Sequence, residues 1–130
     1  MEQKRKKGKF SIMEKLRSSN HAWRGVKVFF QIGYNARLIV FFGALAVYTG
    51  FVLNISAVEW SIIVWTLGLV LVAEMINTAI EIDIDLTSPD YHPYAKDTKD
   101  VAAAAVLVST VVAGVVGLIV FLPKILLLLS

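Results

Sequence analysis

Cysteine is absent from this chain of 130 residues. The sequence therefore predicts neither a disulfide framework nor a thiolate metal site, and it gives no indication of the redox compartment. The two histidines, His21 and His92, are far apart in sequence, which argues against a histidine-based zinc site. Acidic residues are missing from one long region, because no Asp or Glu occurs between Glu14 and Glu59. All ten acidic residues therefore lie outside that region.

Motifs of soluble nucleotide-binding folds are also missing. The chain has no glycine-rich phosphate loop that ends in Lys-Ser/Thr, and it has no nucleophile elbow. If a nucleotide binds, it binds outside a standard soluble fold. The basic start at residues 1–9 is not followed directly by an apolar segment, so we do not expect a cleaved signal peptide.

Apolar residues make up 57% of the chain, and the mean hydropathy is +0.69. These values predict a small integral membrane protein. The amphipathic and apolar segments along the chain further predict an all-α fold, in which an N-terminal amphipathic surface helix precedes three transmembrane helices. The expected spans are residues 36–53, 58–86 and 98–122, with Asp97 or Thr98 as the N-cap of the last span and Pro123 at its end. Gly43 and Gly50 lie on one face of the first span, where they would permit close helix packing.

The pattern divides the chain into four parts. Residues 1–9 are expected to form a basic mobile tail, residues 10–34 an amphipathic surface helix region, residues 35–123 a three-helix transmembrane domain, and residues 124–130 a C-terminal tail. Within the second part, apolar residues recur at helical spacing in two pieces that are interrupted at residues 18–20, while Lys and Arg occupy the other faces. This composition is typical of helices that lie in the membrane interface.

Basic residues predict the orientation in the cell membrane. Ten of the 13 Lys and Arg residues lie in residues 1–37, the 87–99 loop contains two, and the 54–59 turn contains none. The positive-inside rule therefore places the N-terminus and the 87–99 loop in the cytoplasm and the C-terminus outside. A basic arm can also bind nucleic acid, but beside membrane spans it is better explained by anionic lipid. We expect no nucleic-acid partner.

An unusual set of polar residues lies in the second expected span. At about 100° per residue they share one helical stripe, whereas Asp83 falls on the opposite face. The stripe contains Glu74, Asn77, Thr78, Glu81 and Asp85. A carboxylate at the bilayer centre costs about 2.5–3.5 kcal/mol on insertion scales, so such residues usually face a protein interior or a wet cavity. A polar seam between helices is the alternative, but two glutamates and an amide within two turns favour a functional site.

These residue types match the needs of phosphoryl transfer. That chemistry requires Mg²⁺ on carboxylates and phosphates, cations near the developing charge, and a group that orients the attacking hydroxyl. Glu81 is the better metal ligand because it lies nearer the water, and Glu74 suits a general base about 10 Å deeper. A hydroxyl at that depth belongs to a lipid. The alternatives are an ion or proton relay and a purely structural oligomer.

Several segments resemble the small prokaryotic diacylglycerol kinase and undecaprenol kinase family over residues 20–123. They are Ala-Glu-Met-Ile-Asn-Thr-Ala-Ile-Glu at 73–81 with Asp85, Lys-Asp-Val-Ala-Ala-Ala-Ala-Val at 99–106, Ala-Trp-Arg-Gly at 22–25 and Tyr-His-Pro at 91–93. The resemblance implies a homotrimer with active sites between protomers, in which residues 35–123 form the kinase domain. It also implies transfer of the γ-phosphate of MgATP to a lipid hydroxyl.

The resemblance assigns roles to individual residues. Glu74 matches the catalytic base, and Glu81 matches a metal and nucleotide ligand. The positions that match nucleotide contacts are Asp90, Tyr91, His92, Lys99 and Asp100. The positions that match supporting polar or substrate contacts are Asn77, Asp85, Trp23, Arg24, Asn35 and Arg37.

One position departs from the family pattern. Relatives carry a second metal-binding glutamate where this chain has Gly33. Either Mg²⁺ is held by Glu81, phosphates and water, or the chain is a weakly active or inactive structural homo-oligomer. For an active enzyme, the His-Pro-Tyr-Ala-Lys sequence at 92–96 resembles the undecaprenol branch more closely, with diacylglycerol as the other candidate substrate.

Overall fold

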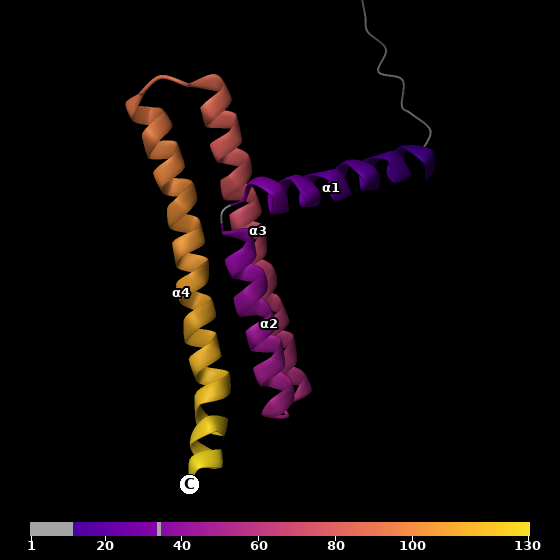
Figure 1. Ribbon diagram of the computed structural model, residues 1–130, viewed down its shortest axis with the longest axis vertical. Coiled ribbons are helices and arrows are strands. Elements are labelled where there is room, and N and C mark those ends of the chain that lie inside the picture. The colour runs from indigo at the N-terminus through magenta and orange to yellow at the C-terminus, as the bar shows by residue number, and fades with distance from the viewer. Residues whose placement is uncertain (1–11, 34) are drawn as a thin grey trace, which may run out of the picture. The chain divides into compact units, whose positions relative to one another are not determined.

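The computed structural model describes residues 12–33 and 35–130, which form four α-helices (Figure 1). The helices are α1 (Ile12–Ile32), α2 (Ala36–Val52), α3 (Ala57–Thr87) and α4 (Pro93–Leu129). The chain divides into two compact units, one ending at Ile32 and the other comprising Gly33–Ser130. Over the described residues the prediction of an all-helical protein is confirmed. The basic tail predicted at residues 1–9 lies outside the described residues.

The first unit contains one continuous helix, α1, of 21 residues. The sequence predicted an interruption at residues 18–20, but the helix passes through them, so that prediction was wrong. Ser and Asn are weak helix formers rather than helix breakers, because each costs less than about 0.7 kcal/mol relative to Ala. Trp23, Lys27 and Phe30 are all exposed on α1.

The second unit is built on the antiparallel pair of α3 and α4, which lie side by side, with α2 packed chiefly against α3 (Figure 1). A capping box begins α3: the Ser56 side chain accepts a hydrogen bond from the Glu59 N–H, and the Glu59 carboxylate accepts one from the Ser56 N–H. The Lys124 ammonium also lies 3.3 Å from Glu59 Oε2. The start of α3 is therefore tied to the end of α4.

Both ends of α4 differ from the prediction. The helix begins at Pro93, because His92 Nδ1 accepts a hydrogen bond from the Tyr94 N–H and a proline is favourable at the first helical position. The predicted caps, Asp97 and Thr98, lie inside the helix. The helix also continues through Pro123 to Leu129. The predicted end at Pro123 was therefore wrong. A proline is tolerated inside a membrane helix because neighbouring helices can satisfy the backbone groups that it leaves unpaired.

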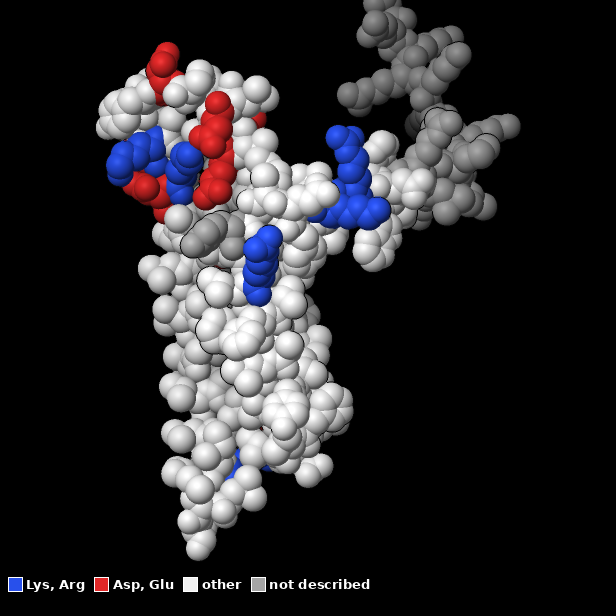
Figure 2. Space-filling model, viewed as in Figure 1, with Lys and Arg blue, Asp and Glu red and all other residues white. Residues whose placement is uncertain are grey.

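Two helices, α3 with 31 residues and α4 with 37, are long and apolar enough to cross a membrane. The 17 residues of α2 are at the lower limit of the roughly 17–25 residues that a transmembrane helix needs. Much of the apolar surface is exposed, including Trp65 at 81%. Figure 2 shows the charged side chains of this unit gathered mainly at the end where α3 stops and α4 starts. The structure therefore has the character of a membrane protein with one polar end.

A small hydrophobic cluster holds the opposite end of this unit together. Ile55, Ile63 and Val120 are buried there, with Trp60 and Phe121 packed against them. Gly50 also lies close to Trp60, so the prediction that this glycine permits close packing is confirmed. Gly43 makes only an ordinary contact, because an added Cβ would lie 3.9 Å from Leu67.

We expect Gly50→Ala to destabilise the fold. A Cβ at position 50 would lie 2.9 Å from the Trp60 ring and 3.0 Å from Ile55, and overpacking of this kind typically costs about 1–3 kcal/mol. Thermal unfolding of the purified protein in detergent should show a lower midpoint. Gly68→Ala is the matched control, because nothing lies within 4 Å of its added Cβ. Equal midpoints for the two variants would contradict the packing argument.

Candidate functional site

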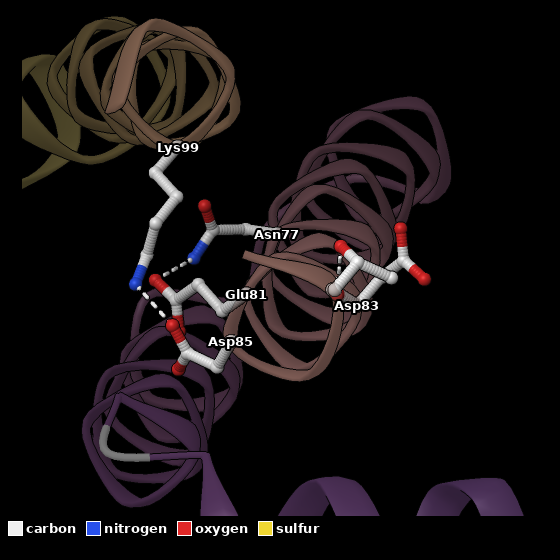
Figure 3. Close-up of polar contacts among 6 residues, drawn as sticks. Asn77, Glu81, Asp83, Asp85 and Lys99 are labelled. Atoms are coloured by element: carbon white, nitrogen blue, oxygen red, sulfur yellow. Dashed lines mark hydrogen bonds and ion pairs between the residues drawn. The ribbon is translucent and has the colours of Figure 1, made fainter. Parts of the chain in front are cut away.

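The polar stripe of α3 passes from the interior to the exposed end of the helix. Glu74, Asn77 and Thr78 are buried, with exposed fractions of 5%, 7% and 9%, whereas Glu81 and Asp85 are exposed. Figure 3 shows Asn77, Glu81 and Asp85 pointing toward Lys99 of α4, with Asp83 on the far side of α3. The helix therefore presents two glutamates in different environments along one face.

The deeper glutamate is held by a residue at the start of another helix. Asn35 precedes α2, and its Nδ2 donates a hydrogen bond to Glu74 Oε1 at 3.0 Å. This contact joins residues that are 39 positions apart in the sequence. The sequence placed both residues in the site but contained no signal of a direct contact between them.

The outer glutamate is held within α3 itself. Asn77 Nδ2 donates a hydrogen bond to Glu81 Oε1 at 2.9 Å, one helical turn along the chain. The oxygen of the same amide, Asn77 Oδ1, is buried and has no hydrogen-bond partner among the described residues. The Asn77 amide thus orients one carboxylate oxygen of Glu81, while its own oxygen is available to a donor that the described residues do not supply.

Ion pairs join the polar end of α3 to the start of α4. Lys99 Nζ lies 2.8 Å from Asp85 Oδ1, and Lys96 Nζ lies 2.6 Å from Asp100 Oδ2. All four side chains are at least 39% exposed, and exposed pairs of this kind contribute little to stability. Because so little stability depends on these pairs, both lysines can exchange their carboxylate partners for phosphate oxygens at low cost.

The carboxylates of the site fit only a partly protein-bound metal ion. Within residues 12–33 and 35–130, no group of three or more His, Asp or Glu residues is arranged to hold a metal. Glu81 is an exposed carboxylate that Asn77 orients, and Gly33 occupies the position where the family resemblance predicts a second acid. Mg²⁺ commonly binds to one or two carboxylates and completes its shell with phosphates and water. The donor set therefore fits Mg²⁺ when a nucleotide supplies the remaining oxygens.

Other predicted residues are not joined to the stripe by any hydrogen bond that the described part of the chain shows. Asp90, Tyr91 and His92 are exposed in the connection between α3 and α4, and Tyr91 is 79% exposed. Arg37 is exposed in the first turn of α2. Trp23 and Arg24 belong to the first unit, and they too are exposed.

A groove of about 970 Å³ lies between α3 and α4. Asn77 contributes to its lining, together with small or polar residues of α4 that include Ala102, Thr98 and Ser109. Sequence reasoning missed Ser109, which is buried and donates a hydrogen bond to the Val106 carbonyl oxygen at 2.8 Å. A signal for it existed, because Ala102 and Ser109 are small residues two turns apart on one helical face.

Comparison with known proteins identifies related chains. The model of the family described as prokaryotic diacylglycerol kinase matches residues 20–121. Undecaprenol kinase of Bacillus subtilis strain 168 is 39% identical over 107 residues, which cover 80% of this chain and 85% of the relative. A diacylglycerol kinase of Synechocystis is 36% identical over 110 residues (84% of this chain, 63% of the relative). One of Pseudomonas aeruginosa is 27% identical over 106 residues (82% and 86%).

Proposed function

The chain belongs to the prokaryotic diacylglycerol kinase family and is a lipid kinase, and from this premise we propose that it transfers the γ-phosphate of MgATP to the hydroxyl group of undecaprenol. One observation carries the proposal. A single face of α3 presents a buried glutamate, Glu74, about two turns from an exposed glutamate, Glu81. One turn beyond Glu81 on the same face, Asp85 forms an ion pair with Lys99 of α4. A lipid hydroxyl and a nucleotide can therefore meet at one place.

The buried Glu74 is the proposed general base. Its carboxylate accepts the proton of the lipid hydroxyl as the hydroxyl oxygen attacks the γ-phosphorus, and ADP leaves with the electrons of the broken phosphoanhydride bond. At 5% exposed, Glu74 lies where water is largely excluded. Lipid rather than water is then the preferred phosphoryl acceptor.

The exposed end of the site is proposed to hold the nucleotide. Glu81 supplies a carboxylate to Mg²⁺, which neutralises phosphate charge when it is bound. Lys99 moves from Asp85 to a phosphate oxygen, and the N-terminus of α4 adds its backbone N–H groups. Asp90, Tyr91, His92 and Asp100 are the further proposed nucleotide contacts, while Asn77, Asp85, Trp23, Arg24 and Arg37 support the site.

The orientation and assembly of the chain are part of the proposal. We place the N-terminus and the α3–α4 connection in the cytoplasm, where ATP is found, and the C-terminus outside. In this arrangement α2 is a third transmembrane helix and α1 lies at the membrane surface. We also propose a homotrimer with sites between protomers. Small residues exposed on α4, including Ala103, Ala104 and Gly114, support close helix packing between protomers in a membrane.

Two features favour undecaprenol over diacylglycerol. The undecaprenol kinase of Bacillus subtilis is 39% identical and is matched over 85% of its length, and the His-Pro-Tyr-Ala-Lys sequence at 92–96 resembles the undecaprenol branch. Diacylglycerol is the second candidate, because the relatives from Synechocystis and Pseudomonas aeruginosa are diacylglycerol kinases.

We expect the purified protein in lipid to transfer label from γ-labelled ATP to undecaprenol faster than to diacylglycerol. The measurement is the initial rate of labelled lipid at matched mole fractions of each alcohol, with and without Mg²⁺. A faster rate with diacylglycerol would reverse the substrate assignment. The absence of transfer to either lipid would favour an inactive structural oligomer instead.

A further inference from the structure

Asn35 occupies the N-cap position of α2 without capping the helix. Its backbone is at φ −84° and ψ −11°, and its side chain makes no hydrogen bond to the first turn. Asn is among the best N-cap residues because its side-chain oxygen normally accepts from the N–H two or three residues on. Here the side chain is used elsewhere, so α2 forgoes a stabilising contact that this residue type usually provides.

The amide of Asn35 instead reaches α3. Its Nδ2 donates to Glu74 Oε1 at 3.0 Å, and this is the side-chain hydrogen bond that Glu74 makes among the described residues. A glutamate has three side-chain torsions, so an unpartnered carboxylate would sample several positions. A donor fixed at the start of another helix restricts the carboxylate to one position. It also occupies Oε1 and leaves Oε2 open.

We propose that Asn35 is a positioning residue that holds Glu74 so that Oε2 is the atom that accepts the proton from the lipid hydroxyl. This inference rests on the proposed function and adds which oxygen of Glu74 acts as the base. The exposed Glu81 has a parallel arrangement, because Asn77 binds its Oε1 in the same way. Each glutamate of the site therefore has one oxygen held by an amide and one oxygen available for chemistry.

The test compares Asn35→Leu with Asn35→Gln in the lipid kinase assay. Leu has nearly the shape of Asn but no N–H, whereas Gln keeps the N–H on a longer side chain. We expect Asn35→Leu to lower kcat about 10- to 100-fold, the size of effect that a misplaced catalytic group produces. The KM values for ATP and lipid should stay within about twofold, because the hydrogen bond contributes to positioning and not to substrate binding. Asn35→Gln should recover most of the lost kcat.

Other outcomes overturn the inference. A kcat of Asn35→Leu within twofold of the wild type would exclude positioning, and an equal loss with Leu and Gln would indicate only a steric role. A rise in KM with unchanged kcat would make Asn35 a binding residue. If Asn35→Leu does not assemble, Asn35→Ala is measured instead against the same criteria. Ser61→Ala is the control, because Ser61 is exposed and, among the described residues, its hydroxyl donates to the Ala57 carbonyl oxygen within its own helix.

The result separates this inference from the proposed function. If the wild type transfers phosphate and the Asn35 variants behave like it, the kinase assignment stands and the role of Asn35 is wrong. If the wild type transfers no phosphate to either lipid, the proposed function fails, and this inference fails with it.

Discussion

Replacing Glu74 by Gln is expected to lower the rate of phosphate transfer to lipid by about 10²- to 10⁴-fold, the contribution usual for a general base. Gln has the size and shape of Glu and can still accept the hydrogen bond from Asn35 through its amide oxygen. It cannot take up the proton of the lipid hydroxyl. The measurement is the initial rate of labelled lipid at saturating ATP and lipid.

Asp83→Asn is the matched control for this prediction. Asp83 lies on the opposite side of the same helix (Figure 3) and is exposed, so the substitution removes the same charge without touching the site. We expect its rate to equal that of the wild type, and we expect both variants to keep the oligomeric state of the wild type in detergent. Transfer by Glu74→Gln within tenfold of the wild-type rate would show that another group accepts the proton.

Replacing Glu81 by Gln is expected to raise the Mg²⁺ concentration needed for half-maximal activity by at least about 100-fold. Loss of a mere supporting contact around a metal commonly costs about 10- to 100-fold in affinity, and here the carboxylate itself is removed. No cluster of three ligands is available among the described residues to compensate. The Gln side chain can still accept from Asn77, so the local geometry is preserved.

The measurement is the rate of lipid phosphorylation as a function of free Mg²⁺ at fixed ATP. In this titration Asp83→Asn is again the control, because it changes net charge by the same amount on the far face of α3. An unchanged Mg²⁺ requirement in Glu81→Gln would place the metal on other oxygens. In that case, the glycine at position 33 would no longer indicate an incomplete metal site.

Much of the candidate site follows from helical periodicity alone. Residues at positions i, i+3, i+4 and i+7 share one face of any α-helix, so the common face of Glu74, Asn77 and Glu81 needed no tertiary structure. The same rule placed Asp83 on the opposite face of the helix. The helical segments were also predictable, because long apolar runs must satisfy their backbone groups internally in a membrane.

The ends of the helices were less predictable. Pro93 is compatible with a loop or with the first position of a helix, and His92 decides between them by accepting the N–H of Tyr94. Pro123 ends many helices, yet α4 continues beyond it, next to the contact between Lys124 and Glu59. Such choices depend on neighbours that a local pattern does not contain.

The sequence by itself determined that this chain is helical and apolar, with an acidic stripe on the helix of its second expected span, because those properties depend on composition and on a fixed period of 3.6 residues. Only the tertiary structure decided that Asn35 holds Glu74 and that Lys99 faces Asp85. These contacts join residues 39 and 14 positions apart. They exist because helix packing brings separate helices within hydrogen-bonding distance, which no local pattern encodes.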